Sequence, residues 1–167
     1  MRSRSVLAAA ALLLVGLPTG AAAAAPHHAV ARCGTGALAL RVRTPPGGAA
    51  AGSTYYRLTL TNTSSATCTL FGYPGVSAVT SGGAQIGVPA RRNPQHASRL
   101  VVLPHGAKAT AILQVVDTHN FPPSLCHART AAGLRVYPPG SFTSKIVRFR
   151  FSVCSTSRSS LSVQAVT

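Results

Sequence analysis

The sequence predicts an all-β protein, an antiparallel β-sandwich of immunoglobulin-like outline with about seven to nine strands. Apolar and polar residues alternate with a period of two in several short segments, the pattern of half-buried strands. Turn residues such as Gly, Pro, Asn and Ser separate these segments at intervals of about 8 to 12 residues. Beyond residue 25 no stretch spaces its apolar residues as a helix would. A closed barrel is the alternative that this pattern allows. The composition has Trp 0, so the core tryptophan of antibody domains is missing.

Residues 1–25 have the layout of a secretory signal peptide. Arg2 and Arg4 precede an apolar run over 6–17, and an alanine run over 21–25 offers a cleavage site. The apolar run is shorter than the ~20 residues that span a bilayer, which favours cleavage over a retained anchor. No later segment is apolar enough to cross a membrane. We therefore expect a secreted, extracellular or cell-wall-associated protein whose residues 26–167 form one domain.

The strand candidates follow one another along this domain, separated by turns. Residues 54–61 place Tyr56, Leu58 and Leu60 on one face, and residues 145–154 set Arg148 and Arg150 opposite an apolar face. Ser81-Gly82-Gly83 predicts a hairpin turn, and loops are predicted over 89–95 and 117–127. The candidates are residues 37–43, 54–61, 67–71, 76–80, 84–88, 99–103, 108–116, 134–137, 145–154 and 161–166.

The domain contains four cysteines, which in an exported chain predict two disulfide bonds. Three pairings are possible. We favour Cys33–Cys68 with Cys126–Cys154, because each pair is local in sequence and would fasten one end of the fold. Zinc binding is the alternative, but no C-x-x-C or closely spaced Cys/His pair provides its usual ligand spacing.

The chain is strongly basic, with Lys+Arg 16, Asp+Glu 1 and a formal net charge of +15. Acid/base pairs, two-metal phosphoryl-transfer sites and glycosidase sites all need at least two carboxylates. The only one in the chain is Asp117. We therefore expect no enzymatic activity and no cofactor, and we expect the surface to attract polyanions.

The remaining catalytic and metal-binding possibilities are weak. Asp117 and His119 could form part of a Ser-His-Asp triad, but no Gly-x-Ser-x-Gly motif accompanies them. Asp117 is more simply explained as a loop cap or as the partner of an arginine. His27-His28 and the pair His119 and His127 are possible metal ligands, but a solvated tail and a loop explain them more simply. We therefore predict no metal site.

Arginine placement gives the more specific binding hypothesis. Side chains two residues apart on a strand project from the same face, and guanidinium groups match phosphate and carboxylate groups bidentately. A solvated sheet face is the alternative explanation for such arginines. The candidate binding residues are Arg41, Arg43, Arg91, Arg92, Arg148 and Arg150.

A set of short motifs covers nearly the whole domain. The motifs are Asn62-Thr63, Cys68-Thr69-Leu70, Gly72-Tyr73-Pro74-Gly75-Val76, Leu103-Pro104-His105-Gly106-Ala107, Leu134-Arg135-Val136-Tyr137-Pro138-Pro139 and Leu161-Ser162-Val163. In this order, and together with Cys126 and Cys154, they resemble the exported actinobacterial proteins grouped as domain of unknown function 4232. The resemblance implies a secreted or lipid-anchored envelope protein with a β-sandwich domain, and it implies no activity. The lipid-attachment cysteine of some relatives is not matched here.

Two functional hypotheses of different classes follow from the sequence. The first is a non-catalytic β-sandwich that binds anionic cell-envelope material or an acidic partner through its arginines. The second is a structural or protein-interaction module that uses an apolar patch or a sheet edge, with the charge serving solubility. Nucleic acid would also bind electrostatically, but an exported location makes that binding incidental.

Overall fold

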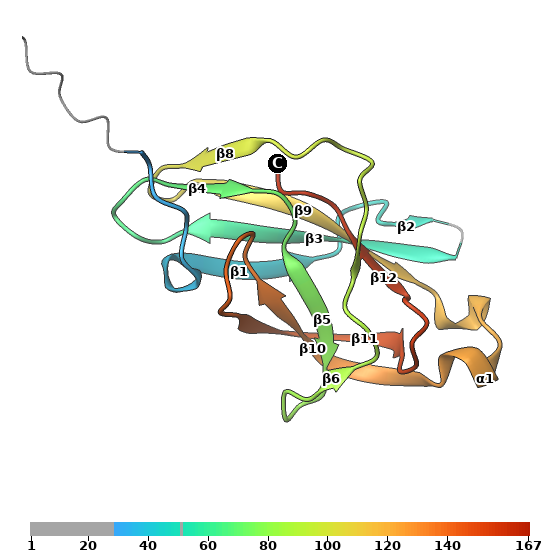
Figure 1. Cartoon of the computed structure of the whole chain (residues 1–167). Helices are drawn as coiled ribbons and strands as arrows, with labels where there is room; N and C mark the ends of the chain where they lie inside the picture. The colour runs from blue at the N-terminus through green and yellow to red at the C-terminus, as the bar shows by residue number, and fades with distance from the viewer. Residues whose placement is uncertain (1–28, 51) are drawn as a thin grey trace, which may run out of the picture.

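The computed structural model describes residues 29–50 and 52–167, so the signal-peptide prediction lies outside the described residues. This part of the chain is mostly β, with three short helical segments (Figure 1). The helical segments are η1 (Thr35–Ala37), η2 (Thr118–Asn120) and α1 (Pro123–Cys126). The strands are β1 (Leu38–Arg43), β2 (Ala49–Ala50), β3 (Ser53–Asn62), β4 (Cys68–Phe71), β5 (Gly75–Val79), β6 (Gln85–Ile86), β7 (Arg91–Arg92), β8 (Leu100–Leu103), β9 (Lys108–Val116), β10 (Ala128–Tyr137), β11 (Lys145–Cys154) and β12 (Leu161–Val163).

The strands form two main sheets and one two-stranded sheet. The first sheet has the order β1-β3-β9-β12-β7, with β2 attached to β3. The second has the order β11-β10-β5-β6, and β4 pairs with β8 in the third. The apolar faces of these sheets share one buried core, so the predicted β-sandwich is confirmed. In Figure 1 the strands of the second sheet cross those of the first.

Alternation along β3 and β9 explains how the first sheet contributes to the core. Leu58 lies opposite Ala111 and Leu60 opposite Ala109, and all four are buried. Thr59, between them on β3, lies on the other face of the sheet, which is polar. The residues that fill the core from both sheets include Leu38, Leu58, Leu60, Leu113, Val76, Ala78, Leu134, Val136, Phe151 and Val153.

The structure has twelve strands in its described residues, more than the seven to nine predicted. The loop predicted over 89–95 is wrong in part, because Arg91 and Arg92 form β7, which runs parallel to β12. A two-residue strand has no alternation to detect. β10 begins at Ala128 rather than at Leu134, because its first three residues are exposed and are held by pairing with β11, so burial does not alternate there. The loop predicted over 117–127 contains η2 and α1.

The two disulfides are the favoured ones, Cys33–Cys68 and Cys126–Cys154. The first fastens the N-terminal segment along β4, where the Cys33 amide donates to the Thr69 carbonyl at 2.9 Å. The second joins α1 to the end of β11. Within residues 29–50 and 52–167, no helix is long and apolar enough to cross a membrane.

Candidate anion-binding site

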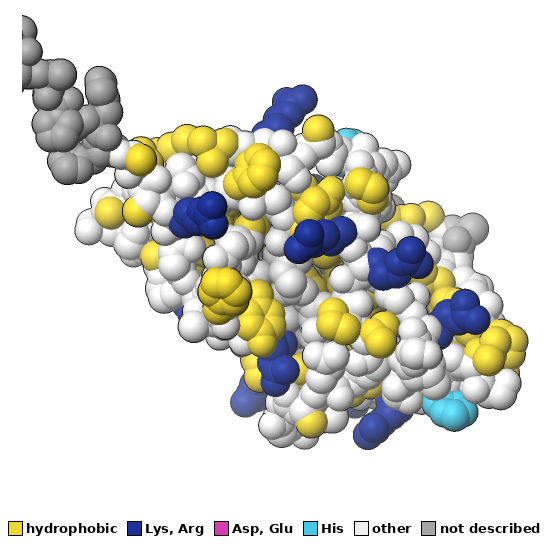
Figure 2. Space-filling view, in the orientation of Figure 1, with side chains coloured by type: hydrophobic (Ala, Val, Ile, Leu, Met, Phe, Trp, Pro, Cys, Tyr) yellow, Lys and Arg dark blue, Asp and Glu magenta, His cyan; other side chains and the backbone are white. Residues whose placement is uncertain are grey.

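Most of the basic side chains of this protein face solvent without an acidic partner. Fourteen of the 16 lysines and arginines lie in the described residues, where the only ion pair joins His119 and Asp117. Arg135 and Lys145 donate to the backbone carbonyls of Gly83 and Leu38, both at 2.6 Å. The face shown in Figure 2 carries basic side chains singly between other groups, and no carboxylate side chain is visible on it. The surface charge is therefore uncompensated and spread out.

Asp117 caps η2, which is one of the two roles predicted for it from the sequence. Its Oδ1 accepts hydrogen bonds from the His119 amide at 3.0 Å and from His119 Nδ1 at 2.8 Å. These two hydrogen bonds hold the pKa of Asp117 below its ordinary value of 3.8. The bond from the His119 amide has the larger effect, and the bond from the His119 ring has the smaller one. Both side chains are exposed, and no serine hydroxyl in the described residues bonds to His119. This geometry provides a helix cap.

We expect an NMR titration of the Asp117 carboxyl group to give a pKa below 3.8 in the folded protein. The substitution His119→Ala should raise that pKa only in part, because the backbone amide of residue 119, the larger cause, remains. Since folding lowers this pKa, the ionised carboxyl group stabilises the folded protein at pH values above its pKa in the unfolded chain. This stabilisation is lost as the pH falls through its pKa in the folded protein. A pKa that is the same in folded and urea-unfolded protein would contradict the cap.

The six predicted arginines do not form one continuous surface. Arg41 and Arg43 lie on β1, on the outer face of the first sheet, with Arg43 opposite Arg57 of β3. Arg148 and Arg150 lie on β11, on the outer face of the second sheet. The inner faces of both sheets meet in the core, so these two pairs point away from each other.

Arg148 and Arg150 border a depression on the second sheet. Its volume is about 670 Å³, and Ile146, which is half exposed, forms part of its lining together with Thr80 and Ser81. The same-face placement of these two arginines that the sequence predicted is confirmed by the burial pattern of β11. The depression is an exposed, mixed polar and apolar surface.

Arg91 and Arg92 lie at the edge of the first sheet and point in different directions. The Arg92 guanidinium carbon is 5.7 Å from the centroid of the Tyr73 ring, a cation–π contact. Arg91 lines a pocket of about 670 Å³ between β7 and two loops. Successive side chains on a strand alternate in direction, so only Arg91 lines this pocket. Both arginines line a smaller depression of about 310 Å³ beside it.

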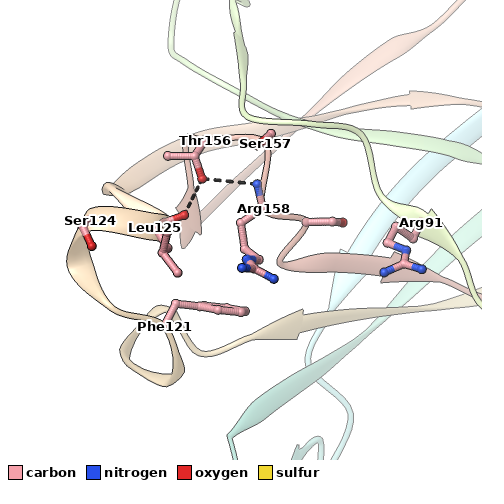
Figure 3. Close-up of a pocket in the computed structure, with 8 residues that line it drawn as sticks. Arg91, Phe121, Ser124, Leu125, Thr156, Ser157 and Arg158 are labelled. Atoms are coloured by element: carbon pink, nitrogen blue, oxygen red, sulfur yellow. Dashed lines mark hydrogen bonds between the residues drawn. The ribbon is translucent and has the colours of Figure 1, made fainter.

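A second arginine, Arg158, which the sequence analysis missed, also lines the pocket beside Arg91. In Figure 3 the guanidinium group of Arg158 lies above the ring of Phe121, and that of Arg91 lies apart from both, to the right of the view. The other lining residues are Ser124, Leu125, Thr156, Ser157 and Ser159. Arg158 lies in a serine-rich loop without alternation. The favoured Cys126–Cys154 pairing was the signal that could have found it, since that bond places the two loops side by side.

The family model described as Domain of unknown function (DUF4232) matches residues 33–167, and the resemblance found in the sequence is thereby confirmed. No curated protein and no solved structure matches the chain.

Proposed function

Because the chain belongs to the DUF4232 family, whose description assigns no activity, we propose that it is an exported, non-catalytic β-sandwich that binds anionic cell-envelope polymers or an acidic partner through its arginines. One observation carries the proposal. Fourteen lysines and arginines in the described residues have no carboxylate side chain within ion-pair distance, because His119 pairs with the single aspartate. An anionic polymer would supply the missing counter-charge.

The distribution of the arginines suits a long ligand. Arg41 and Arg43 on one sheet, Arg148 and Arg150 on the other, and Arg91 with Arg158 at the edge form three separate pairs. A polymer that carries repeated charges can contact more than one pair at once, and such binding gains from effective concentration. Guanidinium groups bind phosphate and carboxylate oxygens bidentately, which favours arginine for this task.

We expect the mature protein to be retained on a heparin or wall-polymer column and released by salt. If it neutralises two to three anionic groups, a fourfold rise in monovalent salt should weaken binding roughly tenfold or more. Three double variants remove two charges each: Arg41→Gln with Arg43→Gln, Arg91→Gln with Arg158→Gln, and Arg148→Gln with Arg150→Gln. Each should elute at lower salt than the native protein. Retention that is the same at low and high salt would contradict the proposal.

One structural observation favours the second hypothesis, that of a protein-interaction module. Phe71 of β4 lies opposite Leu100 of β8, and these side chains are 60% and 64% exposed, with Val102 at 52% beside them. Large apolar side chains grouped at a surface are typical of interaction sites. In a pull-down from cell-envelope extract, loss of the captured partner in Phe71→Ser with Leu100→Ser, but not in the arginine variants, would favour this second function.

A further inference from the structure

We propose that the outer face of β4 and β8, together with Phe142, docks on the surface of a membrane that contains anionic lipids. We call this surface the β4–β8 face, and its residues on the two strands and on the segment beside them are Arg32, Phe71, Leu100 and Val102. The inference goes beyond the proposed polymer binding and does not depend on it. It also names a lipid surface, in place of a protein, as the occupant of these apolar side chains.

The strand register places three exposed apolar side chains side by side. Phe71 lies opposite Leu100, and Val102, two residues further along β8, lies opposite Thr69. Residues that lie opposite each other, or two apart on one strand, project from the same face of a sheet. Phe71, Leu100 and Val102 are all more than half exposed, whereas Leu70, on the other face of β4, is buried in the core. The outer face of this two-stranded sheet is therefore apolar and open to solvent.

A guanidinium group lies at each edge of this apolar face. Arg32 forms a parallel bridge with Thr69 of β4, beside which the Thr69 amide donates to the Ala31 carbonyl at 2.9 Å. As a bridge partner of Thr69, the exposed Arg32 projects on the same side as Val102. At the other edge Arg99 is also exposed and lines a depression along β8 that Val102 shares. The β4–β8 face therefore combines apolar groups in its middle with positive charge at its edges.

Phe142 extends the apolar surface from the loop between β10 and β11, where its side chain is 99% exposed. This loop is held against the N-terminal segment, because Thr35 Oγ1 donates to the Thr143 carbonyl at 2.9 Å and accepts from the Thr143 hydroxyl at 2.8 Å. The loop also contacts Arg32, since a Cβ added to Gly140 would lie 3.1 Å from Arg32 Nη1. Figure 2 shows apolar side chains over β4 and β8 and over this loop, with basic side chains between them. Phe142 is thus presented beside the β4–β8 face by a fixed loop.

This combination of groups fits a lipid surface that carries negative charge. Apolar side chains can enter the boundary of the acyl chains while guanidinium groups contact lipid phosphates, and both contributions add to binding. The only carboxylate side chain in the chain, Asp117, caps η2, so none lies among these arginines to repel an anionic surface. A lipid surface adapts to an apolar side chain that projects alone, as Phe142 does, whereas a protein partner would need a complementary pocket for it.

The course of the chain also brings this face close to a membrane. Residues 31–33 lie along β4, and about a dozen residues separate them from the apolar run over 6–17. Even fully extended, a linker of that length reaches at most ~45 Å. The sequence predicts that the apolar run enters the membrane during export, and the β4–β8 face is then within this distance of lipid.

The test is co-sedimentation of the mature protein, residues 26–167, with vesicles of equal parts phosphatidylglycerol and phosphatidylcholine, and with vesicles of phosphatidylcholine alone. We expect binding to the anionic vesicles and much weaker binding to the neutral ones. Phe71→Ser with Leu100→Ser, and separately Arg32→Gln with Arg99→Gln, should each weaken binding to the anionic vesicles roughly tenfold or more. The control is Leu125→Ser, which removes a half-exposed apolar side chain from α1 at the opposite end of the molecule (Figure 1) and should stay within about twofold of native.

A second measurement locates the contact without removing any apolar group. The composition has Trp 0, so a single introduced tryptophan reports on its own surroundings. The fluorescence emission of Phe142→Trp should shift to shorter wavelength when the anionic vesicles are added, because the ring leaves water. The emission of the control variant Leu125→Trp should not shift.

The outcomes separate this inference from the polymer function. If Phe71→Ser with Leu100→Ser binds the anionic vesicles as tightly as native protein, or if both tryptophans shift equally, the attraction is diffuse and the β4–β8 face is not a docking surface. If native protein binds no vesicles but captures an envelope protein that this double variant loses, the occupant is a protein and the lipid assignment is overturned. Native protein that binds the vesicles but is not retained on heparin would refute the polymer function and leave this inference standing.

Discussion

Replacing both residues of one disulfide, Cys126→Ala with Cys154→Ala, is expected to lower the free energy of unfolding by roughly 3–4 kcal/mol. The two cysteines are separated by 28 residues, and the bond restricts the unfolded chain over that loop. Urea unfolding followed by fluorescence or circular dichroism measures this effect.

The other disulfide is the matched control for this prediction. Cys33 and Cys68 are separated by 35 residues, so Cys33→Ala with Cys68→Ala should destabilise the fold by a similar amount. That bond holds the N-terminal segment to β4 and contributes no residue to the pocket. An unfolding midpoint that is unchanged from the native protein in either double variant would contradict this prediction.

The parts of the fold that the sequence predicted well are those where burial alternates along the chain. Residues 108–116 and 145–154 were predicted with the bounds of β9 and β11, because the exposure of successive side chains alternates along most of each strand. The hairpin of β5 and β6 was predicted from its glycine turn. β7 was missed because it is defined by pairing with β12, a strand that is distant in sequence. The start of β10 was missed because its first three residues are exposed and are held by pairing with the end of β11.

The candidate site was predictable only in part for the same reason. Alternation correctly placed Arg148 and Arg150 on one face, since their geometry is local to β11. The pocket instead combines Arg91 from β7 with Arg158 from a loop more than sixty residues later. No local pattern contains that information. The cysteine pairing was the only sequence feature that related the two loops of the pocket, and it gives no sign of β7.

Asn62, at the end of β3, is fully buried, and its side-chain amide helps to hold two turns together. Its Nδ2 donates to the carbonyls of Ala66 and Leu103, both at 2.8 Å. Its Oδ1 accepts from the Ser64 amide at 3.0 Å and from the Ser64 hydroxyl at 2.7 Å. The backbone of Asn62 also pairs with Gly106 and Ala107, so the residue joins the turn after β3 to the turn between β8 and β9.

We expect Asn62→Ala to lower the free energy of unfolding by about 2–4 kcal/mol. The buried Leu103 carbonyl loses its partner, at about 1–3 kcal/mol, and the part-buried Ser64 amide loses another at a smaller cost. Asn62→Asp keeps the shape of the side chain and the acceptor oxygen but replaces the donor NH2 group by a second oxygen. The carboxylate charge then faces the carbonyl oxygens of Ala66 and Leu103. This variant should therefore be at least as destabilising at neutral pH. Asn93→Ala is the control, since Asn93 accepts only one exposed hydrogen bond, from the Gln95 amide, and should cost under about 1 kcal/mol. Equal midpoints of urea unfolding for Asn62→Ala and Asn93→Ala would mean that Asn62 does not hold these turns.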